Sequence, residues 1–152
     1  MIYADSTFIV ACKVREDTFY RIAEDFFEDH QNETWLWTPW HRIEVFNTIR
    51  QLTRHPETTR RLNLPDAKAL IQRLEEDVRV GYFKHAETDW RNVLRTANEI
   101  SAAHGFTLAS RSADLLHVAY AVEHSARTFV SFDNDQLALA AAGGLKTARP
   151  TA

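Results

Sequence analysis

The stretch RSADLLHVAYAVEHSARTFVSFD, at residues 111–133, decides how this chain folds. Its first half is apolar on nearly every side, which predicts a buried helix from 113 to about 124 that Ser112 caps. The segment RTFVSF, at 127–132, predicts a buried strand. Asp114 lies where the helix begins and Asp133 where the strand ends, which raises the question of what two carboxylates do at the rim of a core.

The rest of the chain alternates short apolar segments with helical patterns. Strand candidates occur at 2–4, 34–37, 80–84 and near 145–148, and helices are predicted after Asp5, at 17–30, from Thr38 to near His55-Pro56, and at 66–78, 88–105 and 135–142. Apolar strands joined by helical crossovers are typical of parallel sheets with helices on both faces. We therefore predict an α/β fold, a three-layer α/β/α arrangement with a mainly parallel central sheet, which residues 1–152 form as a single domain.

Length and composition favour a globular cytoplasmic protein. With 152 residues, 45% of them hydrophobic, the chain is long enough for a full core. The single cysteine, Cys12, has no partner for an internal disulfide, and the first residues lack the pattern of a signal peptide. Charged residues interrupt every apolar run before the ~20 residues that cross a bilayer, so we expect no membrane association.

Charge is distributed unevenly along the chain. The net charge of −3 argues weakly against a general nucleic-acid binder, but residues 42–73 carry seven basic and three acidic side chains. This segment either binds phosphates or is a solvated helical face. Because 14 of the 18 basic residues are arginine, whose planar guanidinium binds phosphate in a bidentate manner, the first interpretation is slightly favoured.

Two carboxylates directly follow predicted strands. Asp5 comes after the strand at 2–4 and Asp133 after the strand at 127–132. The carboxyl ends of parallel strands form a crevice, so both can reach the same edge of the sheet. Asp114 joins them if its helix points its N-terminus at that edge. Asp114 and Asp133 also have a structural interpretation, since Asp is common in first helical turns and at caps.

Glu44 is less clearly marked by the pattern alone. Val45, Phe46 and Ile49 carry the apolar side of the helix that begins near Thr38, whereas Glu44 shares the polar flank with Asn47. Periodicity therefore places Glu44 in solvent.

Four short motifs resemble the PIN-domain ribonucleases, and within them the VapC-like toxins of bacterial toxin–antitoxin pairs. The family has Asp-x-Ser/Thr after its first strand, a helical Glu with Asn three residues on, an Asp-x-x-His-x-Ala helix and Thr/Ser-x-Asp at a strand end. The matching segments here are ADST at 4–7, EVFN at 44–47, RSADLLHVAYA at 111–121 and FVSFD at 129–133. They occur in the family order over most of the chain, and the last two are the most specific.

The resemblance implies roles for individual residues. It makes Asp5, Glu44, Asp114 and Asp133 an acidic catalytic cluster, with Asp5, Asp114 and Asp133 as metal ligands. Supporting positions are Thr7, Ser131 and Asn47, the last of which would orient Glu44. Asp135 stands where the family has no acid, and we interpret it as a flanking residue or a substitute ligand. Candidate RNA contacts are Arg42, Arg50 and Arg111, although Arg111 could equally cap the surface.

The chemistry of such a cluster points to a divalent cation. Carboxylates ~5 Å apart at an effective dielectric of ~20 repel by about 3 kcal/mol per pair. All-oxygen ligation suits Mg²⁺ or Mn²⁺, which can generate hydroxide from bound water and stabilise displacement at phosphorus. We therefore predict a metal-dependent endoribonuclease. The resemblance implies products with 5′-phosphate and 3′-hydroxyl ends, a small antitoxin as partner, and a homodimer.

Other functions remain open from the sequence. The main alternative is a non-catalytic PIN-fold module that binds RNA or protein. A phosphomonoesterase with an aspartyl nucleophile would usually carry a second Asp where Thr7 stands, and a phosphate-accepting signalling domain would need a lysine that FVSFD lacks. His117, one turn after Asp114, is interpreted as a packed, hydrogen-bonded side chain because no Cys or second His lies at metal-ligand spacing.

Overall fold

The computed structural model describes residues 1–54 and 62–151. The end of the helix expected near His55-Pro56 and two bases of the basic segment, Arg60 and Arg61, are among the residues outside this description. The elements, in chain order, are β1 (Ile2–Ala4), α1 (Ser6–Lys13), α2 (Tyr20–Asp29), β2 (Trp35–Trp37), α3 (Pro39–Leu52), α4 (Leu64–Val80), β3 (Phe83–His85), α5 (Trp90–His104), α6 (Ser112–Glu123), β4 (Thr128–Val130), α7 (Asn134–Ala142) and β5 (Lys146–Ala148).

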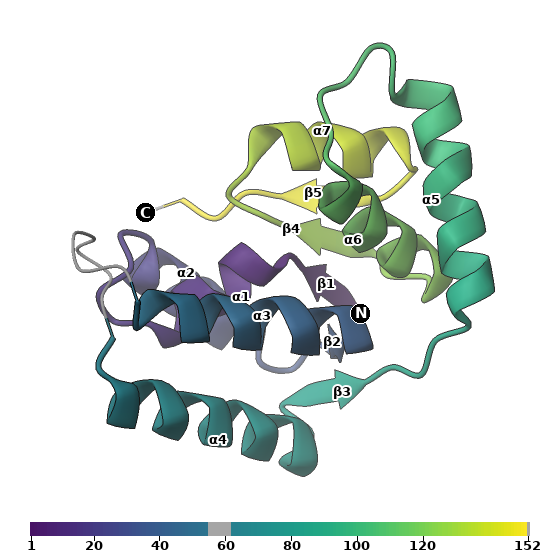
Figure 1. The fold of residues 1–152 in the computed structure, drawn as a ribbon. Coiled ribbons are helices and arrows are strands. Elements are labelled where there is room, and N and C mark those ends of the chain that lie inside the picture. The colour runs from purple at the N-terminus through teal and green to yellow at the C-terminus, as the bar shows by residue number, and fades with distance from the viewer. Residues whose placement is uncertain (55–61, 152) are drawn as a thin grey trace.

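The strands form one parallel sheet in the order β3-β2-β1-β4-β5 (Figure 1). Every neighbouring pair in it is parallel, and β1 pairs with β4 so that Ala4 lies opposite Val130. The chain adds β2 and β3 on one side of β1, then returns to add β4 and β5 on the other. The order of the strands therefore reverses between β1 and β4.

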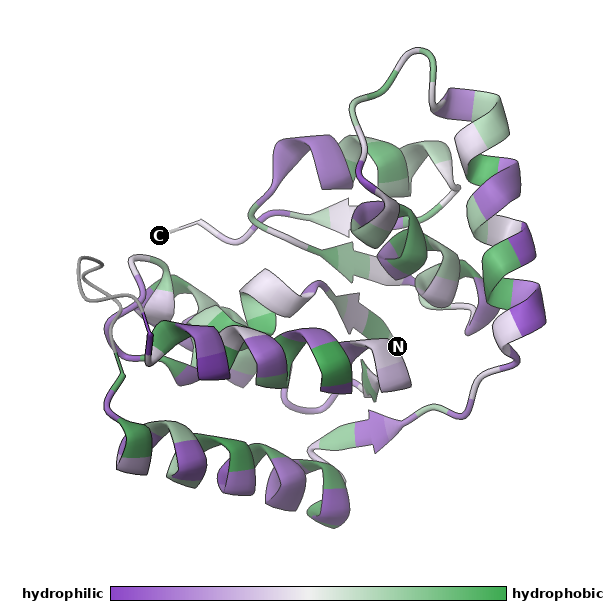
Figure 2. Ribbon diagram, in the orientation of Figure 1, coloured by the Kyte–Doolittle hydropathy of each residue, from purple (hydrophilic) through white to green (hydrophobic). Residues whose placement is uncertain are grey.

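Each face of the sheet has its own hydrophobic core, because successive strand residues point to opposite faces. Ile2 and Ala4 pack with apolar residues of α1, α3 and α4, whereas Tyr3 and Phe129 pack with those of α5, α6 and α7. Hydrophilic and hydrophobic residues alternate along α4 and α5 (Figure 2), as expected of helices that cover a sheet with one side only. This arrangement confirms the predicted three-layer α/β/α fold.

The buried tryptophans of β2 belong to the core. Trp35 and Trp37 are 2% and 1% exposed, and both contact the cluster that lies under α1 and α3. None of the helices in residues 1–54 and 62–151 is long and apolar enough to cross a membrane.

Several predicted boundaries differ from the structure, and two of the differences have clear local reasons. The strand expected at 80–84 is instead β3 at Phe83–His85, because α4 continues to Val80 and ends at Gly81, whose φ of 91° is a left-handed conformation. The cap expected at Ser112 is instead Arg111, and Ser112 is the first helical residue. The Asp114 carboxylate reaches back to the Arg111 backbone N–H and so sets the start of α6 one residue earlier.

A buried leucine and an exposed leucine, on helices that cover opposite faces of the sheet, provide a test of this packing. Leu74, on α4, is 0% exposed, whereas Leu94, on α5, is 54% exposed. We expect Leu74→Ala to lower the free energy of unfolding by about 2–5 kcal/mol, because it leaves a cavity under α4. The control Leu94→Ala should change it by less than about 0.5 kcal/mol. Urea unfolding followed by circular dichroism measures both, and equal losses would contradict the placement of α4.

Candidate active site

The carboxyl ends of β1 and β4 lie side by side where the strand order reverses. Ligand crevices form at such points in parallel sheets, because the helices that follow the two strands leave toward opposite faces. Here α1 follows β1 and packs on one face, and α7 follows β4 and packs on the other. Asp5 comes directly after β1, and Ser131 directly after β4. The sheet register thus brings together two residues that lie 126 positions apart in the chain.

Asp5 is a buried carboxylate held by neutral donors. Its Oδ2 accepts hydrogen bonds from Thr7 Oγ1 at 2.6 Å and Ser131 Oγ at 2.7 Å, and its Oδ1 accepts one from the Phe8 backbone N at 2.7 Å, which caps α1. The residue is 3% exposed and forms no ion pair with a lysine or arginine of the described residues. Burial raises the pKa of Asp5, and the hydrogen bonds from Thr7 and Ser131 oppose that shift.

Asp133 caps a helix, which is the structural interpretation that its sequence position allowed, and it also lines the site. Its Oδ1 accepts hydrogen bonds from the backbone N–H groups of Asp135 and Gln136, at 2.9 and 3.3 Å, which caps α7. Its own backbone N donates to Ser131 Oγ at 2.9 Å. The Ser131 hydroxyl therefore accepts from Asp133 and donates to Asp5, which joins the two acids through one side chain.

Asp114 is paired with Arg111 at the start of α6. The guanidinium donates from Nε to Oδ2 at 3.2 Å and from Nη2 to Oδ1 at 3.3 Å, in addition to the backbone hydrogen bond at 2.8 Å. The Asp114 side chain is 12% exposed, whereas that of Arg111 is 79% exposed. An ion pair open to water to this extent contributes only about 0–1 kcal/mol to stability. The arginine is therefore held loosely.

Glu44 lies in the site rather than in solvent, in contrast to the prediction from periodicity. Its side chain is 28% exposed, and its Oε2 lies 2.5 Å from His117 Nε2 on α6. The polar flank of α3 faces the site because α3 and α6 cover opposite faces of the sheet at the same edge. Burial would raise the pKa of Glu44, but the hydrogen bond and charge of His117, together with a hydrogen bond from Ser6, lower it below its usual value.

His117 is the packed, hydrogen-bonded side chain that the sequence indicated. It is 3% exposed. Its Nδ1 lies 2.8 Å from the Tyr3 hydroxyl, and its Nε2 lies 3.3 Å from Ser6 Oγ as well as close to Glu44. Because a carboxylate can only accept, Nε2 donates to Glu44. The histidine thus fixes Glu44 from across the sheet, a contact that the sequence did not predict.

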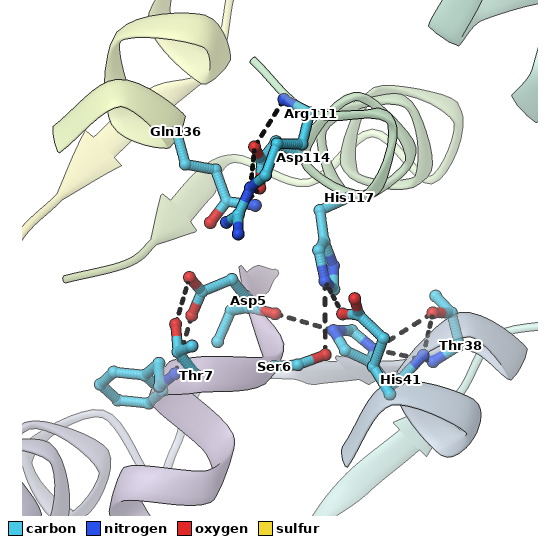
Figure 3. Close-up of polar contacts among 12 residues, drawn as sticks. Asp5, Ser6, Thr7, Thr38, His41, Arg111, Asp114, His117 and Gln136 are labelled. Atoms are coloured by element: carbon cyan, nitrogen blue, oxygen red, sulfur yellow. Dashed lines mark hydrogen bonds and ion pairs between the residues drawn. The ribbon is translucent and has the colours of Figure 1, made fainter. Parts of the chain in front are cut away.

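All four carboxylates line one open pocket of about 470 Å³, together with Thr7, Arg111 and His117. Figure 3 shows Arg111 and Asp114 on one side of this space, with Asp5 and Thr7 on the other. Each acid has a different compensating partner: hydroxyl and N–H donors for Asp5, His117 for Glu44, Arg111 for Asp114 and the first turn of α7 for Asp133. These partners stabilise the four negative charges, so that the protein can fold with all of them at one edge of the sheet.

Four further residues that the sequence analysis proposed for the site lie outside the pocket lining: Asn47, Asp135, Arg42 and Arg50. Asn47 and Asp135 are exposed, and the described residues contain no hydrogen bond between Asn47 and Glu44. Arg42 pairs with Glu75, and both Arg42 and Arg50 lie over the Phe46 ring, with guanidinium carbons 5.2 and 5.9 Å from its centroid. The two arginines therefore share one exposed stripe of α3.

The sequence matches the PIN domain family over residues 2–142, which is most of the chain. The chain belongs to the PIN domain family. Among functionally curated proteins the chain has no match.

Two solved structures share the fold of this PIN domain. The crystal structure of FitAcB from Neisseria gonorrhoeae superposes with a TM-score of 0.67 and 18% sequence identity, over 97% of this chain and 96% of the other. The structure of FitAB bound to an IR36 DNA fragment gives a TM-score of 0.69 and 18% identity, over 99% and 95% of the two chains. At this level of identity the similarity establishes the fold alone.

The pocket of this PIN domain fits a divalent cation in its donor chemistry. The four carboxylates offer only oxygen ligands, which Mg²⁺ and Mn²⁺ prefer, and the buried charge of Asp5 has no lysine or arginine partner among the described residues. In the described part of the chain, however, no three His, Cys, Asp or Glu side chains are grouped closely enough to hold a metal ion. The carboxylates are instead directed to their protein partners.

Sequence reasoning missed several residues of this site, among them Asp17, a further buried carboxylate in the pocket lining. Tyr3 and Ser6 hold His117, and Gln136 lies in the lining with its amide oxygen 3.2 Å from Ser131 Oγ. Ser6 sits inside the ADST motif, and Gln136 follows Asp133 by three residues on the same helical turn. The positions of Ser6 and Gln136 relative to the motifs could therefore have identified them as site residues. Tyr3 could not be identified in this way, because it resembles any other buried strand residue.

The buried His41 links the pH dependence of stability to the helix that carries Glu44. Its Nε2 lies 2.7 Å from the Ala4 carbonyl oxygen, to which it donates, and its Nδ1 accepts from the Thr38 backbone N at 3.0 Å, at the start of α3. Burial, with a smaller contribution from the charge of His117, lowers the pKa of His41 from 6.5 to about 3. Between these values the unfolded chain binds more protons than the folded one, so acidification costs stability.

We expect this contribution to be fully present above pH 6.5 and to be lost as the pH falls toward 3. His41→Gln keeps one acceptor and one donor but does not titrate. Between pH 7 and pH 5 the wild-type protein should therefore lose about 2 kcal/mol more unfolding free energy than this variant. Urea unfolding at the two pH values measures the difference. His85→Gln, which replaces an exposed histidine, is the control, and parallel losses in wild type and His41→Gln would contradict the assignment.

Proposed function

We propose that this PIN domain is a metal-dependent endoribonuclease that hydrolyses RNA phosphodiester bonds, and that it is the toxin of a bacterial toxin–antitoxin module. The observation that carries the proposal is the meeting of four carboxylates, from α3, α6 and the ends of β1 and β4, in one pocket at the switch point of a parallel sheet. A site that served only to bind RNA would have no use for four negative charges facing a polyanion.

In this proposal Asp5, Asp114 and Asp133 hold Mg²⁺ or Mn²⁺, and Glu44 completes the cluster. When bound, such an ion lowers the pKa of water and neutralises charge that develops on the phosphate. Water oxygen bonds to phosphorus as the bond to the 3′-oxygen breaks, which leaves 5′-phosphate and 3′-hydroxyl ends. In this mechanism Glu44 would accept the proton of the attacking water, and its contact with His117 supports the role by fixing the carboxylate. Thr7 and Ser131 keep the Asp5 carboxylate oriented.

An antitoxin and a second copy of the chain are the proposed protein partners. FitAB, which shares the fold, is solved bound to an IR36 DNA fragment. From the likeness of the four motifs to those of VapC-like toxins, we propose that a small antitoxin covers the pocket of this chain and that two copies of the chain associate. The ribonuclease interpretation requires neither partner for cleavage, so the enzyme can be tested alone once it is free of antitoxin.

Cleavage of end-labelled single-stranded RNA tests the proposed activity. We expect cleavage with Mg²⁺ or Mn²⁺ and none with EDTA, and we expect Asp5→Asn and Asp114→Asn to slow it by about 100-fold or more, the scale of a lost electrostatic group. Asp89→Asn is the matched control. Asp89 also caps a helix, α5, but lies outside the pocket lining, so its loss should leave the rate within about twofold of wild type.

The outcomes separate the alternatives. Variants that stay folded and cut as fast as wild type would contradict the acidic-cluster mechanism. A folded, antitoxin-free protein that binds several RNAs in the presence of Mn²⁺ and cuts none would favour the non-catalytic binding module.

A further inference from the structure

We propose that Arg111 is the resident counter-ion of the carboxylate pocket, and that a divalent cation binds only by displacing its guanidinium from Asp114. This inference rests on the proposed metal-dependent function. It adds a competition between one arginine of the chain and the metal, so that the pocket alternates between an arginine-filled form and a metal-filled form.

The ion pair between Arg111 and Asp114 involves both oxygens of the carboxylate. Nε and Nη2 of Arg111 contact Oδ2 and Oδ1 of Asp114, at 3.2 and 3.3 Å, so the guanidinium engages both oxygens of the carboxylate. Oδ2 also accepts the Arg111 backbone N–H at 2.8 Å. A metal ion at Asp114 needs one of these oxygens and would lie beside a positive charge. When the side chain of Arg111 turns away, it frees a carboxylate oxygen and removes the repulsion.

Arg111 is the one lysine or arginine among the described residues that line the pocket. Figure 3 shows its guanidinium directed toward the side on which Asp5 lies. Arg111 therefore supplies a positive charge to the acidic lining, as a bound cation would.

Among the partners of the four acids, Arg111 is the easiest to exchange. His117 is buried at 3% exposure, and the donors to Asp5 and Asp133 include backbone N–H groups of α1 and α7, which cannot move without unwinding a helix turn. Arg111, in contrast, has a side chain that is 79% exposed. Turned outward, its planar fork would lie at the rim of the pocket, free to bind a phosphate of RNA.

Mn²⁺ binding to the full chain, measured by isothermal titration calorimetry without RNA, tests the competition. We expect Arg111→Ala to bind Mn²⁺ about fivefold more tightly than wild type, the change that corresponds to the loss of an exposed ion pair. Arg79→Ala is the control, because Arg79 forms an ion pair of the same i,i+3 spacing with Glu76 on α4, outside this pocket. It should bind Mn²⁺ as wild type does.

A direct readout follows the arginine itself. In ¹H–¹⁵N spectra the Nε–H signal of Arg111, identified by its loss in Arg111→Lys, should shift as Mg²⁺ saturates the site, and that of Arg79 should not. Equal Mn²⁺ affinities of wild type and Arg111→Ala, or weaker binding by the variant, would overturn the competition and leave the metal-dependent nuclease intact. An Arg111 signal that does not move at saturating Mg²⁺ would overturn it as well. No Mn²⁺ binding by either protein would overturn both the competition and the proposed function.

Discussion

The parallel pairing of β1 with β4 is the constraint on which the site depends. It sets Ala4 opposite Val130, so that the residues that follow both strands emerge together, and Ser131 donates to Asp5 at 2.7 Å. A shift of this register would point the strand residues to the wrong faces and would separate the hydroxyl from the carboxylate. The cores on the two faces of the sheet enforce the register, because Tyr3 and Phe129 must face one core while Ala4 and Val130 face the other. The packing of the strands thus determines where the residues that follow them, such as Asp5, are placed.

Charge repulsion is the second constraint, and the fold meets it with four different partners. Hydroxyl and backbone donors hold Asp5, a buried histidine holds Glu44, an exposed arginine holds Asp114, and a helix N-terminus holds Asp133. Three of these partners are rigid, since they belong to helix starts or to the core. The fourth is a surface side chain. Asp114 is therefore the acid whose partner is the most exposed to exchange.

Much of the fold could be predicted from the sequence because its signals are local. Apolar triplets such as Ile2–Ala4 marked the strands, Thr38 with Pro39 marked the start of α3, and Gly105 marked the end of α5. The predictions were wrong where a local signal competed with a contact made by another residue. Ser112 looks like a helix cap, yet the Asp114 carboxylate binds the Arg111 N–H and starts α6 earlier. The helix α4 continues past 78 until Gly81 provides the left-handed conformation that ends it.

The sequence by itself determined which chemistry is available: four acids in family order, an α/β alternation that sends Asp5 and Asp133 to one edge, and hydroxyl groups beside them. Only the tertiary structure decided which neighbours those acids have. Periodicity assigned Glu44 to solvent, because the helical pattern records one core-facing side and cannot record a second packing partner across the sheet. His117 supplies that partner from a residue 73 positions away. The same holds for Arg111, whose type is visible in the sequence but whose place in the pocket, paired with Asp114, depends on how α6 meets the ends of β1 and β4.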